Sequence, residues 1–194
     1  MFGRRRKILA RGPRVYIFSP SRDCADDFLA FTTANADFHQ PWVYPATDAG
    51  TFRGYLERLE EGRAQGFVVA RIADDTILGV INVNDIIRGG FASASLGYYG
   101  HAAYAGRGYM AEGLSLVLDQ AFDEIGLHRI EANVQPGNAN SIALIARLGF
   151  RKEGFSPRFL QINGIWRDHE RWAILLEEWR AKALASGDHV SRVV

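Results

Sequence analysis

The sequence predicts an α+β protein in which a mixed, largely antiparallel sheet of six to seven strands carries helices on both faces. Two observations lead to this fold class. Short runs rich in β-branched and aromatic residues, such as 66–72 and 77–83, alternate with amphipathic segments of helical spacing, such as 110–125. The order is strand, two helices, three strands, helix, strand, helix and two strands, which does not fit a purely parallel sheet.

The bulk composition is that of one ordinary globular domain. The chain has 194 residues, of which 47% are hydrophobic and 23% are charged, enough for a substantial core. A net charge of +1 gives no global attraction to nucleic acid or to a membrane. The single cysteine, Cys24, excludes an internal disulfide and a cysteine-cluster metal site. We therefore expect a cytoplasmic protein with no bound metal and no membrane segment.

We expect three parts along the chain. Residues 1–13 form a flexible basic arm, residues 14–180 form a single domain, and residues 181–194 form a C-terminal tail. The arm carries five basic residues, which are Arg4, Arg5, Arg6, Lys7 and Arg11. Such a cluster is either a solvated tail or a weak contact to ribosomal RNA.

The first strand and helix of the domain are followed by a proline-broken loop. Residues 14–18 alternate like a strand, and Asp23 is placed to cap the helix that follows. The loop at 39–45 contains the three rings of His39, Trp42 and Tyr44. These rings either wall a substrate groove or pack against the core.

The next segments continue the sheet. Thr47 or Asp48 starts a second amphipathic helix. Residues 66–72 and 77–83 then form an antiparallel hairpin. A glycine turn leads from this hairpin into a strand over residues 94–99.

A glycine-rich turn then connects that strand to the helix at 110–125. Gly106 and Gly108 stand just before the helix, where unpaired backbone N–H groups meet the positive end of the helix dipole. Glycine lets a phosphate approach this backbone closely. The residues of the turn alone leave three interpretations. The turn is a phosphate site, a dinucleotide-binding turn of the form Gly-x-Gly-x-x-Ala with Glu131 on the ribose, or a turn without a ligand.

Several further segments narrow this choice. They are Leu96-Gly-Tyr98, Gly106-Arg-Gly-Tyr-Met-Ala-Glu112, His128-Arg129, Asn138-x-x-Ser141, Leu148-Gly-Phe150, Glu153-Gly154 and Asn163-Gly-Ile-Trp-Arg-Asp-His169. Together they resemble the GNAT acetyltransferase superfamily. Within it they resemble the RimJ/RimL branch, which acetylates the N-termini of bacterial ribosomal proteins. The resemblance is collinear from about Val15 to Leu176.

The resemblance implies a GNAT fold and acetyl-CoA as co-substrate. The fold includes a splay between the fourth and fifth expected strands that admits the pantetheine arm. The implied cofactor-binding residues are Tyr99, Gly100, Ala105, Gly106, Arg107, Gly108, Tyr109, Met110 and Asn138. Two positions depart from the pattern. Ala105 stands where the superfamily has glutamine or arginine, and Met110 stands where it has a small residue, but the loop acts through its backbone.

Ser141 is the implied proton donor to the departing thiolate. The resemblance places Asn138 beside the pantetheine and Ser141 near the sulfur. Without the resemblance, Asn138 or Asn140 is a helix cap and Ser141 is a first-turn residue with no catalytic role. Part of the branch carries a glutamate base at the position that matches Leu160 here, so that role does not transfer.

The amine must lose a proton before it attacks. An α-amino group has a pKa near 8, against about 10.4 for lysine, so a modest base or a relayed water suffices for it. Glu131 is the best candidate for that base. The alternative is that Glu131 is only an ion-paired residue without a catalytic role. We expect structural roles for Glu112 at a helix start and for His128 and His169. The oxyanion donor is expected among the backbone N–H groups of residues 96–100.

The sequence therefore predicts an acetyl-CoA-dependent N-acetyltransferase that acts on a protein N-terminus, such as the alanine or serine of a ribosomal protein. Trp42, Tyr44 and Trp166 are the expected walls of its acceptor groove. One alternative is an acetyltransferase for a small amine, such as an antibiotic or a polyamine. Another is a non-catalytic domain that binds acyl-CoA or the ribosome. Both a monomer and a homodimer are compatible with the sequence.

Overall fold

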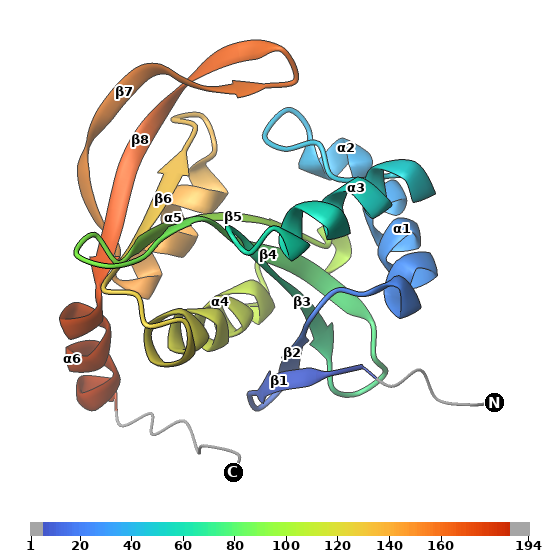
Figure 1. The fold of residues 1–194 in the computed structure, drawn as a ribbon, viewed down its shortest axis with the longest axis horizontal. Coiled ribbons are helices and arrows are strands. Elements are labelled where there is room, and N and C mark those ends of the chain that lie inside the picture. Colours follow the sequence, from blue (N-terminus) through green and yellow to red (C-terminus); the bar gives the residue numbers. More distant parts are fainter. Residues whose placement is uncertain (1–5, 187–194) are drawn as a thin grey trace.

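The computed structural model describes residues 6–186, which form a single mixed sheet of eight strands with helices around it (Figure 1). The strands are β1 (Ile8–Arg11), β2 (Val15–Phe18), β3 (Gln65–Arg71), β4 (Ile77–Ile87), β5 (Ser93–Gly100), β6 (Arg129–Val134), β7 (Arg151–Ile162) and β8 (Ile165–Leu175). Their order in the sheet is β1-β2-β3-β4-β5-β6-β8-β7. β5 and β6 are parallel, and all other neighbours are antiparallel. The predicted α+β class is confirmed.

The helices connect the strands. They are η1 (Arg22–Cys24), α1 (Ala25–Ala34), α2 (Ala36–His39), α3 (Ala49–Glu60), η2 (Ala102–Tyr104), α4 (Tyr109–Asp119), the π-helical turn η3 (Gln120–Glu124), α5 (Ala139–Leu148) and α6 (Leu176–Ser186). α3 begins where the sequence predicts, because the Asp48 carboxylate accepts the N–H groups of Gly50 and Thr51 at 2.8 and 2.9 Å. α1 begins after η1, and Ser21 rather than Asp23 precedes that turn.

The sheet has one strand more than the expected six to seven, because β1 lies inside the segment expected to be a flexible arm. β1 pairs antiparallel with β2. Only three apolar residues stand among basic ones in this segment, so its sequence does not look like a strand. It gains its order from the neighbouring strand at the sheet edge. The expected arm at 1–13 is therefore wrong for residues 8–11.

Arg6 also belongs to the folded domain. Its guanidinium donates to the hydroxyl of Tyr16 at 2.7 Å and to the carboxylate of Asp27 at 3.0 Å, and its side chain is 15% exposed. This arginine is therefore not available to an RNA partner as the basic-arm hypothesis required. Arg4 and Arg5 lie outside the described residues. At the other end α6 continues beyond residue 180, into the segment expected to be a tail.

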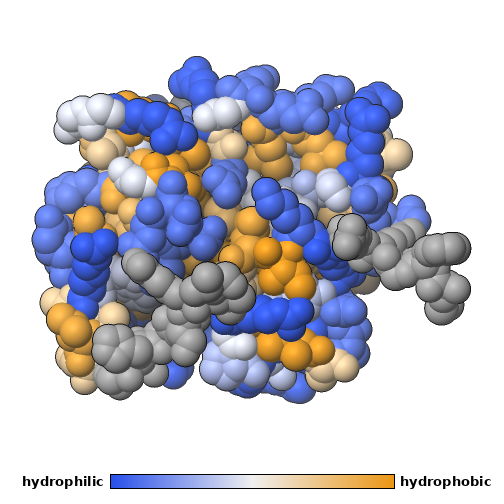
Figure 2. All heavy atoms as spheres, turned by 60° about the horizontal axis from the view of Figure 1, so that its bottom comes forward, coloured by the Kyte–Doolittle hydropathy of each residue, from blue (hydrophilic) through white to orange (hydrophobic). Residues whose placement is uncertain are grey.

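Alternation along the central strands gives the sheet two buried faces. On β2, Val15 and Ile17 pack with α4, whereas Tyr16 and Phe18 pack on the opposite side with α1 and α3. All four side chains are buried. Because both faces are covered, these strands are apolar throughout rather than alternating with polar residues. The surface turned forward in Figure 2 is mixed, with hydrophobic patches separated by hydrophilic side chains.

β5 and β6 are paired over only the first part of their length. Their parallel pairing covers Ser93–Leu96 with Arg129–Ala132. β5 nevertheless stays paired with β4 as far as Gly100, and β6 stays paired with β8 as far as Val134. The backbone edges beyond Leu96 and Ala132 therefore face each other without pairing. This is the splay expected between the fourth and fifth predicted strands.

The helices of the described part, residues 6–186, are all too short or too polar to cross a membrane.

Candidate active site

Two cavities meet where β5 and β6 separate. The first, of about 610 Å³, lies between the glycine turn before α4 and the outer side of α5, and we call it the loop cavity. The second, of about 740 Å³, lies between the β4–β5 hairpin, β6 and the β7–β8 hairpin, and we call it the groove. The residues common to both linings are Trp42, Val43, Tyr98, Asn138 and Ser141. A molecule in each cavity would therefore reach the same few side chains.

The glycine turn has the backbone geometry of an anion site. Gly106 and Gly108 have φ angles of 72° and 82°, which glycine adopts without strain, and Gly108 precedes the first turn of α4. Among residues 6–186, no hydrogen bond takes up the N–H groups from Gly106 to Met110. These donors lie at the positive end of the α4 dipole. The turn therefore suits a phosphate group, as the sequence predicts.

Arg14 and Glu112 hold this turn in place. The Glu112 carboxylate accepts the backbone N–H groups of Arg14 at 2.7 Å and of Val15 at 3.0 Å, and it pairs with the Arg14 guanidinium at 2.8 Å. The same guanidinium donates to the carbonyl of Arg107 at 3.1 Å. Glu112 thus has the structural role expected for it. The part played by Arg14 was not predicted, because its partners are more than 90 positions away in the chain.

Met110, which departs from the pattern of the resemblance, lies over two glycines. Gly79 of β4 and Gly100 of β5 are register partners. A Cβ atom on Gly79 would lie 2.4 Å from the Met110 sulfur, and one on Gly100 would lie 3.2 Å from its Cγ. The absent side chains of these glycines make room for the methionine. Met110 and Ala105, the second departure, both line the loop cavity.

The remaining predicted cofactor residues divide into two groups. Gly100, Tyr109 and Asn138 line the loop cavity, and Tyr99 contributes to its wall while its ring stacks on Phe31 in the core. The guanidinium of Arg107 lies 5.7 Å from the ring of Tyr104 and is not part of the cavity lining. The structure therefore does not bring the Arg107 side chain to the predicted site.

Ser141 lies where the two cavities meet and is held from two sides. Asn138 caps α5 by accepting the backbone N–H of Ser141 at 3.1 Å, so Asn138 rather than Asn140 is the cap. The hydroxyl of Tyr98 lies 2.5 Å from the Ser141 hydroxyl. Burial raises the pKa of Tyr98 to about 12. The 43 residues that separate Tyr98 from Ser141 in the chain leave no sequence signal for this contact.

Glu131 has the ion-paired environment that was the alternative to its catalytic role. It lines the groove, but one carboxylate oxygen accepts from Arg129 at 3.0 Å and the other accepts from Arg171 at 2.6 Å. Arg129 also pairs with Glu153, which extends the ion-pair network along the strand surface. A general base needs a carboxylate oxygen that is open to the amine. The expected base role of Glu131 therefore finds no support in this geometry.

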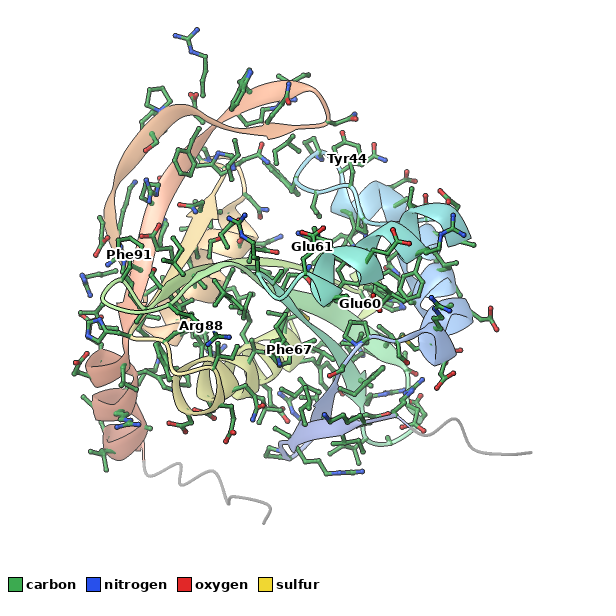
Figure 3. The ribbon with its side chains drawn as sticks, in the orientation of Figure 1. Tyr44, Glu60, Glu61, Phe67, Arg88 and Phe91 are labelled. Carbon is green, nitrogen blue, oxygen red and sulfur yellow. The ribbon has the colours of Figure 1, made fainter. Side chains whose placement is uncertain are left out.

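Of the three predicted aromatic walls, the structure brings only Trp42 to the site. Its ring is so close to Gly137 that a Cβ there would lie 3.1 Å from Trp42 Cη2. Tyr44, labelled on the loop between α2 and α3 in Figure 3, is 44% exposed and lines neither cavity. Trp166 lies near the tip of the β7–β8 hairpin, is 57% exposed and also lines neither cavity. Tyr44 and Trp166 are therefore exposed outside both cavities, and their contact with an acceptor stays a prediction.

Other side chains form the groove walls in their place. Ile87 and Phe91 line it from the β4–β5 hairpin, and Leu160 lines it from β7. Glu61 lines it at the end of α3 (Figure 3). All four are exposed side chains, so the groove is open to solvent on this side. Exposed apolar residues at turns of a hairpin give no distinctive pattern in the sequence, and they were not predicted.

The two histidines expected to be structural have local partners. His128 lies 3.1 Å from Glu177 of α6. His169 is buried, and its Nδ1 lies 2.9 Å from the carbonyl of Arg167. Within the described residues, no group of three or more histidine, cysteine, aspartate or glutamate side chains is arranged to hold a metal ion.

Comparisons with known proteins show which family the chain belongs to. Residues 14–151 match the family model described as an acetyltransferase (GNAT) domain. A probable N-acetyltransferase of Bacillus subtilis, YjcK, is 35% identical over 175 residues, which is 86% of this chain and 97% of that protein. The ribosomal protein uS5-alanine N-acetyltransferase of Escherichia coli is 33% identical over 153 residues, covering 75% of this chain and 79% of its own.

A solved structure shows the same arrangement of the chain. RimJ of Mycobacterium smegmatis, determined in a complex with CoA-disulfide, superimposes with a TM-score of 0.79 at 28% identity, over 91% of this chain and 93% of that one. Because the family model covers residues 14–151 and the fold agrees, this chain belongs to the GNAT acetyltransferases, is related to their RimJ/RimL branch, and is an N-acetyltransferase.

Proposed function

We propose that this protein transfers the acetyl group of acetyl-CoA to the α-amino group of a polypeptide N-terminus, with ribosomal proteins as the first substrates to test. One observation carries the proposal. A cavity of about 610 Å³ beside the glycine turn meets a groove of about 740 Å³ at a small set of residues that includes Ser141 with its hydroxyl. A donor and a chain-like acceptor can therefore meet at that hydroxyl from opposite sides.

The loop cavity suits the donor. Its volume of about 610 Å³ is within the range of small-molecule sites, which is about 300–1,000 Å³. The free N–H groups from Gly106 to Met110 would hold the pyrophosphate of acetyl-CoA. The lining then continues past Tyr99 and Gly100 to Ser141, along the unpaired edge of β5. An extended pantetheine arm fits such an edge, because its amide groups can pair with free backbone groups.

Ser141 would supply the proton that the reaction needs at sulfur. The amine nitrogen attacks the thioester carbon, a C–N bond forms, and the carbonyl oxygen takes negative charge that a backbone N–H of the β5 edge can stabilise. The C–S bond then breaks, and sulfur leaves with the electron pair and takes the hydroxyl proton of Ser141. The nitrogen loses one proton to water, which restores the serine hydroxyl through solvent. The products are the acetylated amine and the free thiol.

The amine would reach this point with little help from a base. An α-amino group with a pKa near 8 is uncharged in about a tenth of molecules at pH 7. The geometry leaves Glu131 engaged with two arginines, so water in the open groove is the proton acceptor that we propose. A lysine side chain, with a pKa of about 10.4, would be neutral far less often at the same pH. This difference favours an α-amine over a lysine.

The groove favours a polypeptide over a small polycation. Its lining includes Arg58, Arg63 and Arg171 as well as Glu61, Asp85 and Glu131, so its formal charges cancel and do not attract a polyamine. The apolar residues at its mouth would contact the side chains that follow the N-terminus. Relatives named for ribosomal protein uS5 and for RimJ add to this proposal.

The test is a panel of acceptors incubated with acetyl-CoA, with thiol release and product mass as readouts. It contains peptides that begin with alanine or serine, the same peptides blocked at the N-terminus but containing lysine, and spermidine. We expect acetylation of the free N-termini, with a rate that rises through about pH 8 as the amine loses its proton. Equal acetylation of the blocked peptides, or preference for spermidine, would overturn the N-terminal proposal. No thiol release with any acceptor would favour a binding protein.

A further inference from the structure

Tyr98 and Ser141 come to the site from opposite sides of the gap between β5 and β6. Tyr98 lies on β5 beyond the last residue that pairs with β6, and Ser141 lies in the first turn of α5, which follows β6. Their hydroxyl oxygens are 2.5 Å apart, a short distance for two hydroxyl groups. Both residues line both cavities. The contact therefore spans the point where donor and acceptor would meet.

The chemistry of the two hydroxyls indicates which one donates. A phenol, with an ordinary pKa of about 10, is a far better proton donor than an aliphatic alcohol. This difference favours donation by Tyr98 to the hydroxyl oxygen of Ser141 at 2.5 Å, which leaves the hydrogen of Ser141 free to point elsewhere. The backbone carbonyl of Ser141 is a second, more distant acceptor for the Tyr98 hydroxyl, at 3.5 Å. If Ser141 donated to Tyr98 instead, the serine hydrogen would point to Tyr98 and away from the loop cavity.

Two further features keep this arrangement fixed. Burial keeps the Tyr98 hydroxyl protonated, with a pKa raised to about 12, so it stays a donor at every pH at which the protein would work. Asn138 fixes the backbone of Ser141, because its side-chain oxygen accepts the Ser141 backbone N–H at 3.1 Å. A first-turn serine could otherwise turn its hydroxyl toward nearby backbone groups. With the backbone fixed by Asn138 and the oxygen held by Tyr98, rotation of the hydroxyl is the freedom that remains.

We propose that Tyr98 is a positioning residue that holds the Ser141 oxygen by hydrogen-bond donation, so that the Ser141 hydrogen points to the sulfur of the thioester. This inference rests on the proposed function of Ser141 as proton donor. As the C–S bond breaks, the proton moves from the serine oxygen to sulfur and negative charge grows on that oxygen. The Tyr98 hydroxyl then stabilises the charge by a stronger hydrogen bond, and the serine regains its proton from solvent.

The test is a double-mutant cycle of Tyr98→Phe and Ser141→Ala, with kcat and KM measured for acetyl-CoA and an alanine-starting peptide. Tyr98→Phe keeps the ring and removes only the hydroxyl. We expect it to lower kcat about 10-fold or more with an unchanged KM for acetyl-CoA, because the lost bond is strongest in the transition state. Ser141→Ala should lower kcat about 100-fold. In the Ser141→Ala background, Tyr98→Phe should change kcat less than about twofold.

Tyr55→Phe is the matched control. The Tyr55 hydroxyl is also buried and donates to Asn82 at 2.7 Å, but Tyr55 lines neither cavity. This variant loses one buried hydrogen bond and should lose stability with kcat unchanged. If Tyr98→Phe behaved like it, with lower stability and normal kcat, the positioning role would be wrong.

The outcomes separate the two proposals. A loss from Tyr98→Phe of the same size in both backgrounds would overturn the inference while leaving the proton-donor role of Ser141 intact. A normal kcat for Ser141→Ala would overturn the role of Ser141 and the inference with it. The N-terminal specificity is measured separately, by the acceptor panel with the unaltered protein. Decreases in kcat that are not additive, with an unchanged KM for acetyl-CoA, would support the joint action of Tyr98 and Ser141.

Discussion

Glu112 accepts the backbone N–H of Arg14 at 2.7 Å, although the two residues are 98 positions apart in the chain. The contact joins the first turn of α4 to the start of β2, and the Arg14 guanidinium extends it to the carbonyl of Arg107 in the glycine turn. The proposed donor site thus depends on contacts outside the turn itself, which we call the brace. The backbone geometry that would bind phosphate is set by tertiary packing as well as by glycine.

Replacing Glu112 with alanine should destabilise the protein. The substitution leaves the N–H groups of Arg14 and Val15 without their carboxylate partner, and such a loss costs about 1–3 kcal/mol. Urea unfolding measures the difference. Glu57→Ala is the control, since the exposed pair of Glu57 with Arg53 has an N–O distance of 3.9 Å and should contribute under about 1 kcal/mol. Equal effects of the two substitutions would show that the brace is no more than a surface ion pair.

Replacing Gly108 with valine should weaken acetyl-CoA binding at least 10-fold, which is roughly 1.4 kcal/mol. A β-branched residue is strained at a φ of 82°, and its Cβ would lie 3.3 Å from the Arg14 guanidinium. Calorimetry on folded protein measures the affinity. Gly126→Val is the control, because Gly126 has a similar φ of 77°, open space around its Cβ and no place in either cavity lining. Unchanged affinity in Gly108→Val would remove the turn from the donor site.

Replacing Glu131 with glutamine should reduce kcat less than about 10-fold at pH 8, since loss of a general base typically costs about 100- to 10,000-fold. The carboxylate is held by Arg129 and Arg171, so its removal should instead show as lower stability. Steady-state kinetics over about three pH units, from roughly pH 6 to 9 around the α-amine pKa, give the comparison. A decrease in kcat of more than about 100-fold, as expected for the loss of a general base, would support Glu131 as the base.

Stability should rise with pH through the range around the ordinary histidine pKa, in part because of His39. Burial lowers the pKa of His39 below its ordinary value of 6.5, and its Nε2 lies 2.8 Å from the carbonyl of Gly100. The unfolded chain therefore takes up a proton near pH 6.5 that the folded protein does not, so stability falls as pH drops through 6.5. Thermal unfolding of the wild type and of His39→Gln at several pH values measures this. An identical pH dependence in both would contradict the assignment to His39.

Local sequence signals were sufficient for the parts of the site made by one segment. The positive φ angles of the turn are favoured by Gly106 and Gly108, and the cap of α5 is favoured by Asn138 just before the helix. Both features can be predicted from residues that are neighbours in the sequence. The same is true of the central strands, because their apolar runs are long. These features were predicted together with the family and the fold.

Contacts between distant segments could not be predicted in this way. The partner of Ser141 depends on how far β5 and α5 approach across the gap, and the environment of Glu131 depends on Arg171 of β8. Trp166 has the large aromatic side chain expected of a groove wall, but its position near the tip of the β7–β8 hairpin leaves it exposed. β1 is ordered by its pairing with β2 rather than by its own sequence.

The four-residue ladder between Ser93–Leu96 and Arg129–Ala132 is the sole strand pairing that connects β1–β5 to β6–β8 in the described sheet. The sheet therefore has a seam at its centre, and a ligand seated in the seam would act as a removable strand between the two halves. We expect the amide hydrogens on the facing edges of β5 and β6 to exchange with solvent faster while the seam is empty than when it is filled. The free energy of local opening of the sheet would then rise with the concentration of the co-substrate. The sheet would open least often when the co-substrate is bound and the protein is ready to react.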